Sequence, residues 1–236
     1  MKRPNAMVKP SQLRHSRNST DHPYPFEYMT DSTQQFSQQG SDLYVPDAQN
    51  EALPRTTHLG VGAHQDDLEF MAMHGILECY EKDHQWFGGV TCTNGAGSAR
   101  TGEFANVTDE AMQAIRAEEQ RDASRVGQFS FMAQLHLPSS SIKDPTNDDL
   151  ENDLVKILAE SQPEVVYTHN LADKHSTHIA VAASLIKAIR RLPKDQRPKK
   201  LIGCEVWRDL DWMPDSKKIV MDLSSRPEFA TQLNGL

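Results

Sequence analysis

Charged side chains that directly follow an apolar stretch are the first sign of chemistry in this sequence. Residues 60–63 read Gly-Val-Gly-Ala, and His64-Gln65-Asp66-Asp67 come straight after them. His64 and Asp67 are three residues apart, so one tight turn brings an imidazole and a carboxylate to a common point while Asp66 projects elsewhere. This spacing fits His64 and Asp67 as two metal ligands and Asp66 as a free base. The alternative is that the two aspartates only cap the helix that follows, where carboxylates are favoured.

A second polar cluster follows another apolar stretch later in the chain. Residues 165–168 read Val-Val-Tyr-Thr, and three of the ten histidines, His169, His175 and His178, lie in the next ten residues. His175 and His178 are spaced i and i+3 at the start of an expected helix and share a face, so one can bind a metal while the other faces the remaining coordination space. In isolation the pair could be a surface feature. Together the two clusters predict a His, Asp and His metal site with an open position.

The composition limits what such a site can be. The three cysteines are widely spaced and form no Cys-x-x-Cys pair, so neither a disulfide framework nor a thiolate zinc site is indicated. The formal charge of −8 argues against a duplex-DNA binder. No apolar run approaches the roughly 20 residues of a membrane span, and the first residues lead into polar sequence instead of a signal-peptide core. We therefore expect a cytoplasmic protein that has no membrane span and binds no nucleic acid.

Alternating strands and helices must position the two clusters. The apolar runs predict strands at residues 57–63, 87–93, 133–137, 165–168 and 201–206. The segments between them predict helices at residues 68–82, 109–127, 148–161 and 177–192. This alternation is typical of an α/β domain with a Rossmann-like, mainly parallel sheet flanked by helices. Ligands bind at the carboxyl ends of such strands. We therefore expect the imidazoles of His64 and His178 within about 6 Å of each other, close enough to share one ion.

The chain is expected to contain an extension and one domain. Residues 1–52 are rich in polar residues and proline, without a helical or strand period, and predict a largely irregular N-terminal extension. Its scattered aromatic side chains leave open a segment that wraps a neighbouring subunit, so a homo-oligomer is possible. Residues 53–236 are expected to form the domain. A sixth strand is predicted at residues 219–223, shortly before the sequence stops, which suggests a domain that is short at its C-terminus.

The two polar motifs resemble those of a known family. Ala63-His64-Gln65-Asp66-Asp67 and the later run from Asp173 to His178 resemble the PIG-L or LmbE-like zinc-dependent deacetylases, whose usual motifs are Ala-His-Pro-Asp-Asp and His-x-x-His. The resemblance extends over about residues 57–212 and implies an LmbE-like fold. It also implies one zinc ion on His64, Asp67 and His178, with Asp66 as the general base and His175 facing the substrate carbonyl. Arg116 matches a family arginine that lines the site, so the resemblance implies that it contacts the substrate.

The sequence departs from the family pattern at two positions. Gln65 replaces the usual proline, and Thr177 stands where many members have an aspartate. The second departure leaves Asp173 as the expected orienter of His175. A carboxylate beside an imidazole raises its pKa, so His175 is expected to be cationic near neutral pH.

Three further segments are expected to reach the same edge of the sheet. The Asn94–Ser98 loop follows the second strand and is expected to form a wall of the pocket, with Asn94 as a substrate contact. His169 ends a strand beside the expected metal and is a second candidate contact. Trp207 and Trp212 follow the fifth strand, where they could stack on a sugar ring or close the core.

These residues are suited to amide hydrolysis. Zn²⁺ with three protein ligands lowers the pKa of a bound water to about 7, and Asp66 can take the proton of that water. A protonated His175 would donate a hydrogen bond to the developing oxyanion. We therefore predict a zinc-dependent deacetylase of an N-acetylated amino sugar or amino-sugar conjugate. Two alternatives stay open, a metal-dependent hydrolase of another small amide and a non-catalytic zinc-binding interaction protein.

Overall fold

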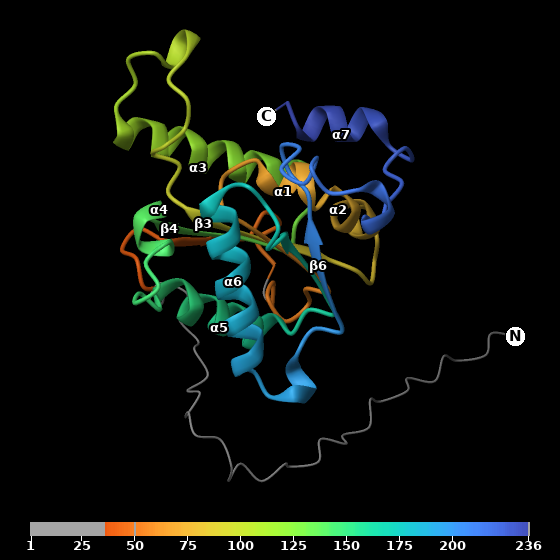
Figure 1. The fold of residues 1–236 in the computed structure, drawn as a ribbon. Coiled ribbons are helices and arrows are strands. Elements are labelled where there is room, and N and C mark those ends of the chain that lie inside the picture. Colours follow the sequence, from red (N-terminus) through yellow and green to blue (C-terminus); the bar gives the residue numbers. More distant parts are fainter. Residues whose placement is uncertain (1–35, 50, 236) are drawn as a thin grey trace, which may run out of the picture. The chain divides into compact units, whose positions relative to one another are not determined.

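The computed structural model describes residues 36–49 and 51–235 of the chain. Its centre is a six-stranded sheet with the order β1-β4-β3-β2-β5-β6 (Figure 1). The strands are β1 (Asp42–Tyr44), β2 (His58–Gly62), β3 (Phe87–Thr93), β4 (Phe131–Leu137), β5 (Val165–His169) and β6 (Lys200–Cys204). All neighbouring strands pair in parallel except β1, which runs antiparallel to β4 at one edge. The predicted α/β fold with a mainly parallel sheet is confirmed.

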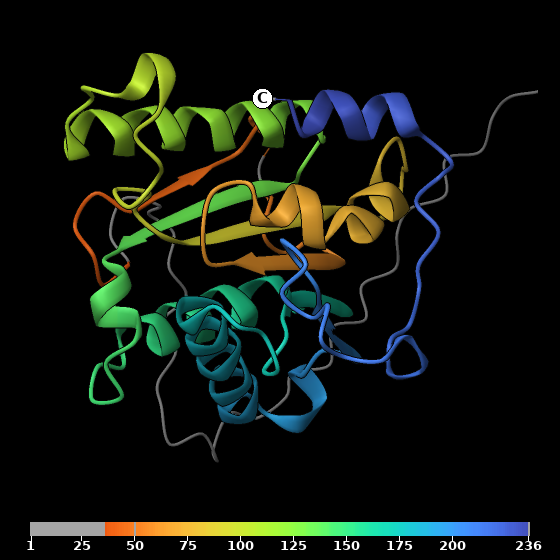
Figure 2. The same cartoon turned by 45° about the horizontal axis from the view of Figure 1, so that its top comes forward.

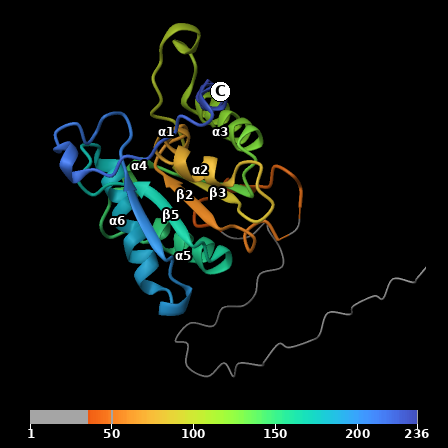
Figure 3. The same cartoon turned by 90° about the vertical axis from the view of Figure 1, so that its right-hand side faces the viewer.

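Helices cover both faces of this sheet (Figures 2 and 3). They are α1 (Asp67–Met71), α2 (Met73–Cys79), α3 (Asp109–Val126), α4 (Ser139–Ile142), α5 (Asp149–Ser161), α6 (Ser176–Arg191) and α7 (Pro227–Leu233). Short 3-10 turns occur at Gly102–Phe104, Lys194–Gln196 and Asp215–Lys217. Helices α5 and α6 lie on one face, and α1, α2, α3 and α7 lie on the other. None of the helices among the described residues is both long and apolar enough to cross a membrane.

The core consists of two apolar clusters, one on each face of the sheet. Leu59 and Val61 of β2 face the cluster beneath α5 and α6, and neither has exposed surface. The alternate β2 position, Gly60, faces the cluster that contains Leu68 and Phe87. A Cβ atom at Gly60 would lie 2.6 Å from Phe87 Cζ, so the absence of a side chain there lets α1 and β3 approach closely. Burial on both faces is the environment in which short apolar runs form parallel strands.

Helix α2 approaches the sheet through a second glycine. A Cβ atom at Gly75 would lie 2.5 Å from Cε2 of Tyr167, whose ring is buried in β5. The Tyr167 hydroxyl lies 2.9 Å from Nδ1 of His74, so the same contact also satisfies a polar group. The expected helix at residues 68–82 is interrupted at Ala72, where the backbone has φ −105° and ψ 13°. Helices α1 and α2 therefore form two short segments, the first next to the site and the second against β5.

The ends of the described chain differ from the sequence expectation. Strand β1 and the buried residue Ala52 lie inside the segment 1–52 that was expected to be largely irregular, so packing begins before residue 53. Residues 1–35 of that extension lie outside the described residues. The strand predicted at residues 219–223 is wrong, since these residues form no strand and Ile219 and Val220 are each 89% exposed. An apolar run forms a strand only where a neighbouring strand can satisfy its backbone.

Candidate metal centre

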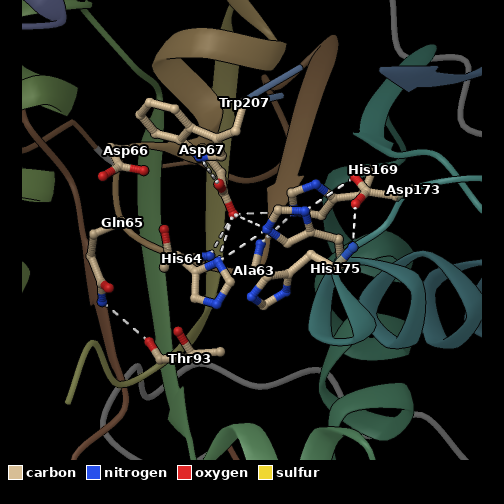
Figure 4. Close-up of polar contacts among 12 residues, drawn as sticks. Ala63, His64, Gln65, Asp66, Asp67, Thr93, His169, Asp173, His175 and Trp207 are labelled. Atoms are coloured by element: carbon tan, nitrogen blue, oxygen red, sulfur yellow. Dashed lines mark hydrogen bonds and ion pairs between the residues drawn. The ribbon is translucent and has the colours of Figure 1, made fainter. Parts of the chain in front are cut away.

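The candidate site begins at the carboxyl end of β2, in the middle of the sheet. The backbone turns sharply after Ala63, because Asp66 adopts a left-handed conformation with φ 84° and α1 begins at Asp67. The backbone N–H of His64 donates to Asp67 Oδ2 over 2.7 Å and closes the turn. As a result the two neighbouring carboxylates point in different directions (Figure 4). The Asp67 side chain has no exposed surface, whereas that of Asp66 is 41% exposed.

Three donor atoms from the two polar clusters converge beside this turn. His64 Nδ1 lies 3.2 Å from His178 Nε2 and 3.3 Å from Asp67 Oδ2, and the third side of the triangle, Asp67 Oδ2 to His178 Nε2, is 3.7 Å. Two ligands with bonds of about 2.1 Å at a tetrahedral angle lie about 3.4 Å apart. The spacing of the donors therefore fits one tetrahedral divalent ion. It also meets the requirement that the imidazoles of His64 and His178 lie close enough to share an ion.

The protonation states of Asp67 and His178 suit a metal. Although burial on its own raises the pKa of Asp67, hydrogen bonds and charges from the His169 and His64 rings hold that pKa well below its usual range. Burial, together with the neighbouring His169, lowers the pKa of His178 to about 4. Near neutral pH the carboxylate is therefore ionised and the His178 ring is neutral. A metal needs ligands in these forms.

Asp173 contacts a different ring from the one expected. Its Oδ2 lies 3.1 Å from His178 Nδ1, and its Oδ1 accepts the backbone N–H of His175 over 2.7 Å. The expectation that Asp173 orients the His175 ring is wrong, because α6 begins at Ser176 and carries His178 back over the carboxylate. A carboxylate on the outer nitrogen of a ligating histidine fixes the ring and its tautomer. Asp209 Oδ2 lies 3.5 Å from the same His178 nitrogen.

His175 faces the other two site histidines. Its ring lies edge-on to His64, with 5.0 Å between ring centroids, and 4.4 Å from the His178 ring. Burial and the neighbouring His64 lower the pKa of His175, and the nearby Asp67 and Asp173 carboxylates only partly oppose them. The expectation of a cationic His175 is therefore wrong in direction. A neutral imidazole still carries one N–H that can donate a hydrogen bond.

His169 lies behind the donor atoms and not in the cavity. Its side chain has no exposed surface, and its ring stacks on His178 with 3.9 Å between centroids and 6° between planes. Its Nε2 accepts the backbone N–H of Ala63 over 2.9 Å and lies 3.2 Å from Asp67 Oδ2. The expected contact between His169 and substrate is wrong, because the strand buries this residue one layer below the site. It packs against His178 and accepts a hydrogen bond from the Ala63 backbone instead.

Helix α3 holds the turn that carries Asp66. Arg116 Nη2 donates to Asp66 Oδ2 over 2.6 Å and to the backbone oxygen of Gln65 over 2.8 Å. One helical turn later, Gln120 Oε1 accepts the Asp66 backbone N–H over 3.3 Å. Burial and the charge of Asp67 raise the pKa of Asp66 to about 6, against the opposing charge of Arg116. Arg116 was expected as a substrate contact, and the structure also gives it the role of holding Asp66.

The loop after β3 is fixed against the same turn. Gln65 is buried, and its Nε2 donates to the backbone oxygen of Thr93 over 3.1 Å. Gly95 has φ 73°, and a Cβ atom there would lie 2.8 Å from Gln65 Oε1, so both the backbone and the space favour glycine. Asn94 lies at the cavity as expected, but its Oδ1 already accepts the backbone N–H of Ala96 over 3.1 Å. Gln65 thus connects the turn after β2 to the loop after β3.

A cavity of about 570 Å³ opens beside the donor atoms. Its wall includes expected site residues, namely His64, Asp66, Asn94, Arg116, His175 and His178. It also includes Trp207, whose place in the site or the core was open, and Lys143 and Asp209, for which no site role was expected. The sequence could have indicated Asp209, because it follows β6 and residues after the carboxyl ends of parallel strands lie at the same edge of the sheet. Lys143 had no such signal, because it follows the short helix α4.

Comparisons with known proteins agree with this fold. The family model described as "PIG-L: GlcNAc-PI de-N-acetylase" matches residues 59–189, which include both polar clusters. A comparison with curated proteins finds no match. Among solved structures, the conserved protein TT1542 from Thermus thermophilus is similar with a TM-score of 0.59 and 19% identity, covering 76% of this chain and 77% of that one.

Two further solved structures have named activities. The N,N'-diacetylchitobiose deacetylase from Pyrococcus horikoshii has a TM-score of 0.56 and 17% identity, covering 79% of this chain and 71% of its own. GalB, the 4-carboxy-2-hydroxymuconate hydratase from Pseudomonas putida, has a TM-score of 0.56 and 19% identity, covering 75% of this chain and 77% of its own. A deacetylase and a hydratase therefore share this fold, so the fold alone does not decide the reaction.

Proposed function

This chain belongs to the PIG-L family of de-N-acetylases, and from that premise we propose that it is a zinc-dependent deacetylase acting on an amino sugar or an amino-sugar conjugate. The observation that carries the proposal is the triangle formed by His64 Nδ1, Asp67 Oδ2 and His178 Nε2, with sides of 3.2, 3.3 and 3.7 Å. These residues would hold one zinc ion per chain. Asp66 lies next to Asp67 in sequence and lines the same cavity as His64 and His178.

Zinc supplies a Lewis acid at such a site and lowers the pKa of water to about 7. Asp66 accepts the proton of the attacking water, because its carboxylate is ionised above its pKa of about 6 and reaches the cavity. The N–H of neutral His175 donates to the acetamide oxygen, on which negative charge develops. Asp66 then returns the proton to the amine nitrogen as the C–N bond breaks. Acetic acid and the free amine leave, and the acid loses its remaining proton to the amine or to solvent.

Acetate release tests the proposal directly. The purified chain is assayed on N-acetylglucosamine, N,N'-diacetylchitobiose and N-acetylglucosaminyl-phosphatidylinositol, with and without a chelator. We expect acetate from at least one substrate, abolished by the chelator and restored by Zn²⁺. Release of a different acid from other amides would support the hydrolase of another small amide. A chain that binds one zinc and releases nothing would contradict the proposal and support a zinc-binding interaction protein.

A variant of Asp66 separates catalysis from metal binding. Asp66→Asn keeps the left-handed backbone, which asparagine tolerates well, and removes the base. We expect stoichiometric zinc and at least about a hundredfold lower kcat. Asp144→Asn, at an exposed aspartate outside the cavity, is the matched control and should leave kcat unchanged. Near-normal turnover by Asp66→Asn would remove Asp66 from the reaction.

A further inference from the structure

Trp207 occupies an unusual position at the edge of the site. It follows β6 in a turn where two consecutive residues have left-handed backbones, Trp207 with φ 54° and Arg208 with φ 59°. Side chains with a Cβ avoid this region, so the surrounding contacts must hold the turn in place. Two contacts of the indole are with α1, the helix that carries Asp67. The ring packs on Phe70 with 4.4 Å between centroids, and Nε1 donates to Asp67 Oδ1 over 3.3 Å.

The indole N–H distinguishes the two oxygens of Asp67. Oδ1 accepts from Trp207, whereas Oδ2 lies 3.3 Å from His64 Nδ1 and 3.7 Å from His178 Nε2. The carboxylate has no exposed surface in the structure, so its oxygens rely on donors from the protein. The hydrogen bond therefore fixes the carboxylate with one oxygen toward the donor triangle. Figure 4 shows the indole on the side of Asp67 opposite the imidazoles.

Trp207 also lines the cavity beside the donor atoms. Trp207 is 54% exposed, and it lines the 570 Å³ cavity together with His64, His175 and His178. An exposed indole beside a hydrolytic centre offers a flat, electron-rich surface. The C–H groups on one face of a pyranose ring fit such a surface, in the same way that the positive edge of an aromatic ring packs on a π face.

We propose that Trp207 is a positioning residue for Asp67 and the platform on which the sugar ring of the substrate lies. The first role acts through the indole N–H and concerns the donor triangle alone. The second role rests on the proposed function, because it requires an amino-sugar substrate. The two roles use different parts of the side chain, so substitutions separate them.

Trp207→Phe removes the N–H and keeps an aromatic ring. Zinc affinity is measured by competition with a chromophoric chelator, and the absorption spectrum of the Co²⁺-substituted protein reports the coordination geometry. Outer partners of metal ligands commonly affect affinity by about 10- to 100-fold. We expect zinc affinity to fall at least about tenfold, with an altered Co²⁺ spectrum and KM within about twofold of wild type. Zinc affinity equal to that of wild type would overturn the positioning role.

Trp212→Phe is the matched control. Trp212 is also exposed, at 59%, and its indole N–H donates to the backbone oxygen of Ala172 over 3.2 Å. It does not line the 570 Å³ cavity. The same chemical change at this position should leave zinc affinity, the Co²⁺ spectrum and KM unchanged. An equal loss of zinc affinity in Trp212→Phe would show a general effect of the substitution and overturn the assignment to Trp207.

Trp207→Leu tests the platform. It keeps apolar volume and removes the aromatic face, so we expect the zinc loss of Trp207→Phe and, at saturating zinc, a KM at least about fivefold higher. An unchanged KM would overturn the platform.

If circular dichroism shows that Trp207→Leu does not fold, Phe70→Leu takes its place. Phe70→Leu removes the ring that supports Trp207, and we expect the same rise in KM. A wild type that releases no acetate contradicts the proposed function, yet the zinc titrations still decide the positioning role.

Discussion

Asp66 and Asp67 show how one turn gives two neighbouring carboxylates opposite properties. Asp67 is buried among imidazoles that hold its pKa well below the usual range. Burial and the charge of Asp67 raise the pKa of Asp66 to about 6. Pairs of acids whose environments separate their pKa values commonly divide the work of a reaction between them. The left-handed backbone at Asp66 is the local cause, since it sends the two side chains in different directions.

The pKa of Asp66 predicts the acidic side of the pH profile. The base must be ionised, so kcat/KM should fall about tenfold per pH unit below a pH of about 6. Arg116 stabilises the ionised form, and Arg116→Met should therefore move this limb to higher pH, by about one unit. Arg125→Met is the control, because Arg125 lies on the same helix and pairs with Glu118 and Asp122. If the acidic limb of kcat/KM lies at the same pH in Arg116→Met and in the wild type, the assignment of this limb to Asp66 is contradicted.

The convergence of the two polar clusters followed from the sequence because parallel strands end at one edge of a sheet, and the choice of His178 as the third ligand came from the family resemblance. The position of each supporting side chain did not follow. Asp173 contacts His178 because the first turn of α6 decides which ring lies over it. His169 is buried because β5 lies next to the central strand β2. Burial and side-chain direction depend on the neighbouring elements, which spacing along the chain does not contain.

At the scale of elements, the segments with the most continuous apolar sequence were predicted best. Strand β3 has the predicted bounds of residues 87 and 93, and every residue in it is buried. Strand β1 was missed because it has three residues and exists only through its pairing with β4. Residues 219–223 have strand-like sequence, but in the described part of the chain the sheet ends at β6. Strand formation depends on a partner more than on local preference.

Helix α2 offers a test of close packing. Gly75→Ala would gain up to about 1 kcal/mol of helix propensity, but the new Cβ would lie 2.5 Å from the Tyr167 ring. That ring is buried, and the Tyr167 hydroxyl is hydrogen-bonded to His74, so the ring cannot easily move. We therefore expect a net loss of about 1–3 kcal/mol in the free energy of unfolding. Urea denaturation measures it. Gly97→Ala, where a Cβ would meet nothing within 4 Å, should change stability by less than about 0.5 kcal/mol. A more stable Gly75→Ala protein would contradict the packing argument.

At the scale of the molecule, a metal would join segments that are far apart in the chain. His64 and His178 are separated by 114 residues and meet because β2 and β5 pair at the centre of the sheet. A ligand that binds only the folded state stabilises it by about 2.7 kcal/mol at a hundredfold excess over its Kd. We therefore expect Zn²⁺ to raise the Tm of the metal-free chain by several degrees.

Variants of two histidines check that prediction by thermal unfolding with and without Zn²⁺. His178→Ala should lose the increase in Tm, because one of the three donors is gone. His84→Ala is the control, since His84 is exposed and outside the cavity, and it should show the wild-type increase. Equal increases in the two variants would place the zinc elsewhere on the chain.

The distance in sequence between the donors also bears on how the protein is made. On the ribosome, His64 and Asp67 emerge long before His178, which follows the β5 strand. A nascent chain that ends before α6 holds two of the three donors and none of the helix that brings in the third. A metal ion held by all three donors therefore cannot bind while only the first two have been synthesised. Binding by all three donors must wait until translation has delivered both central strands and the start of α6.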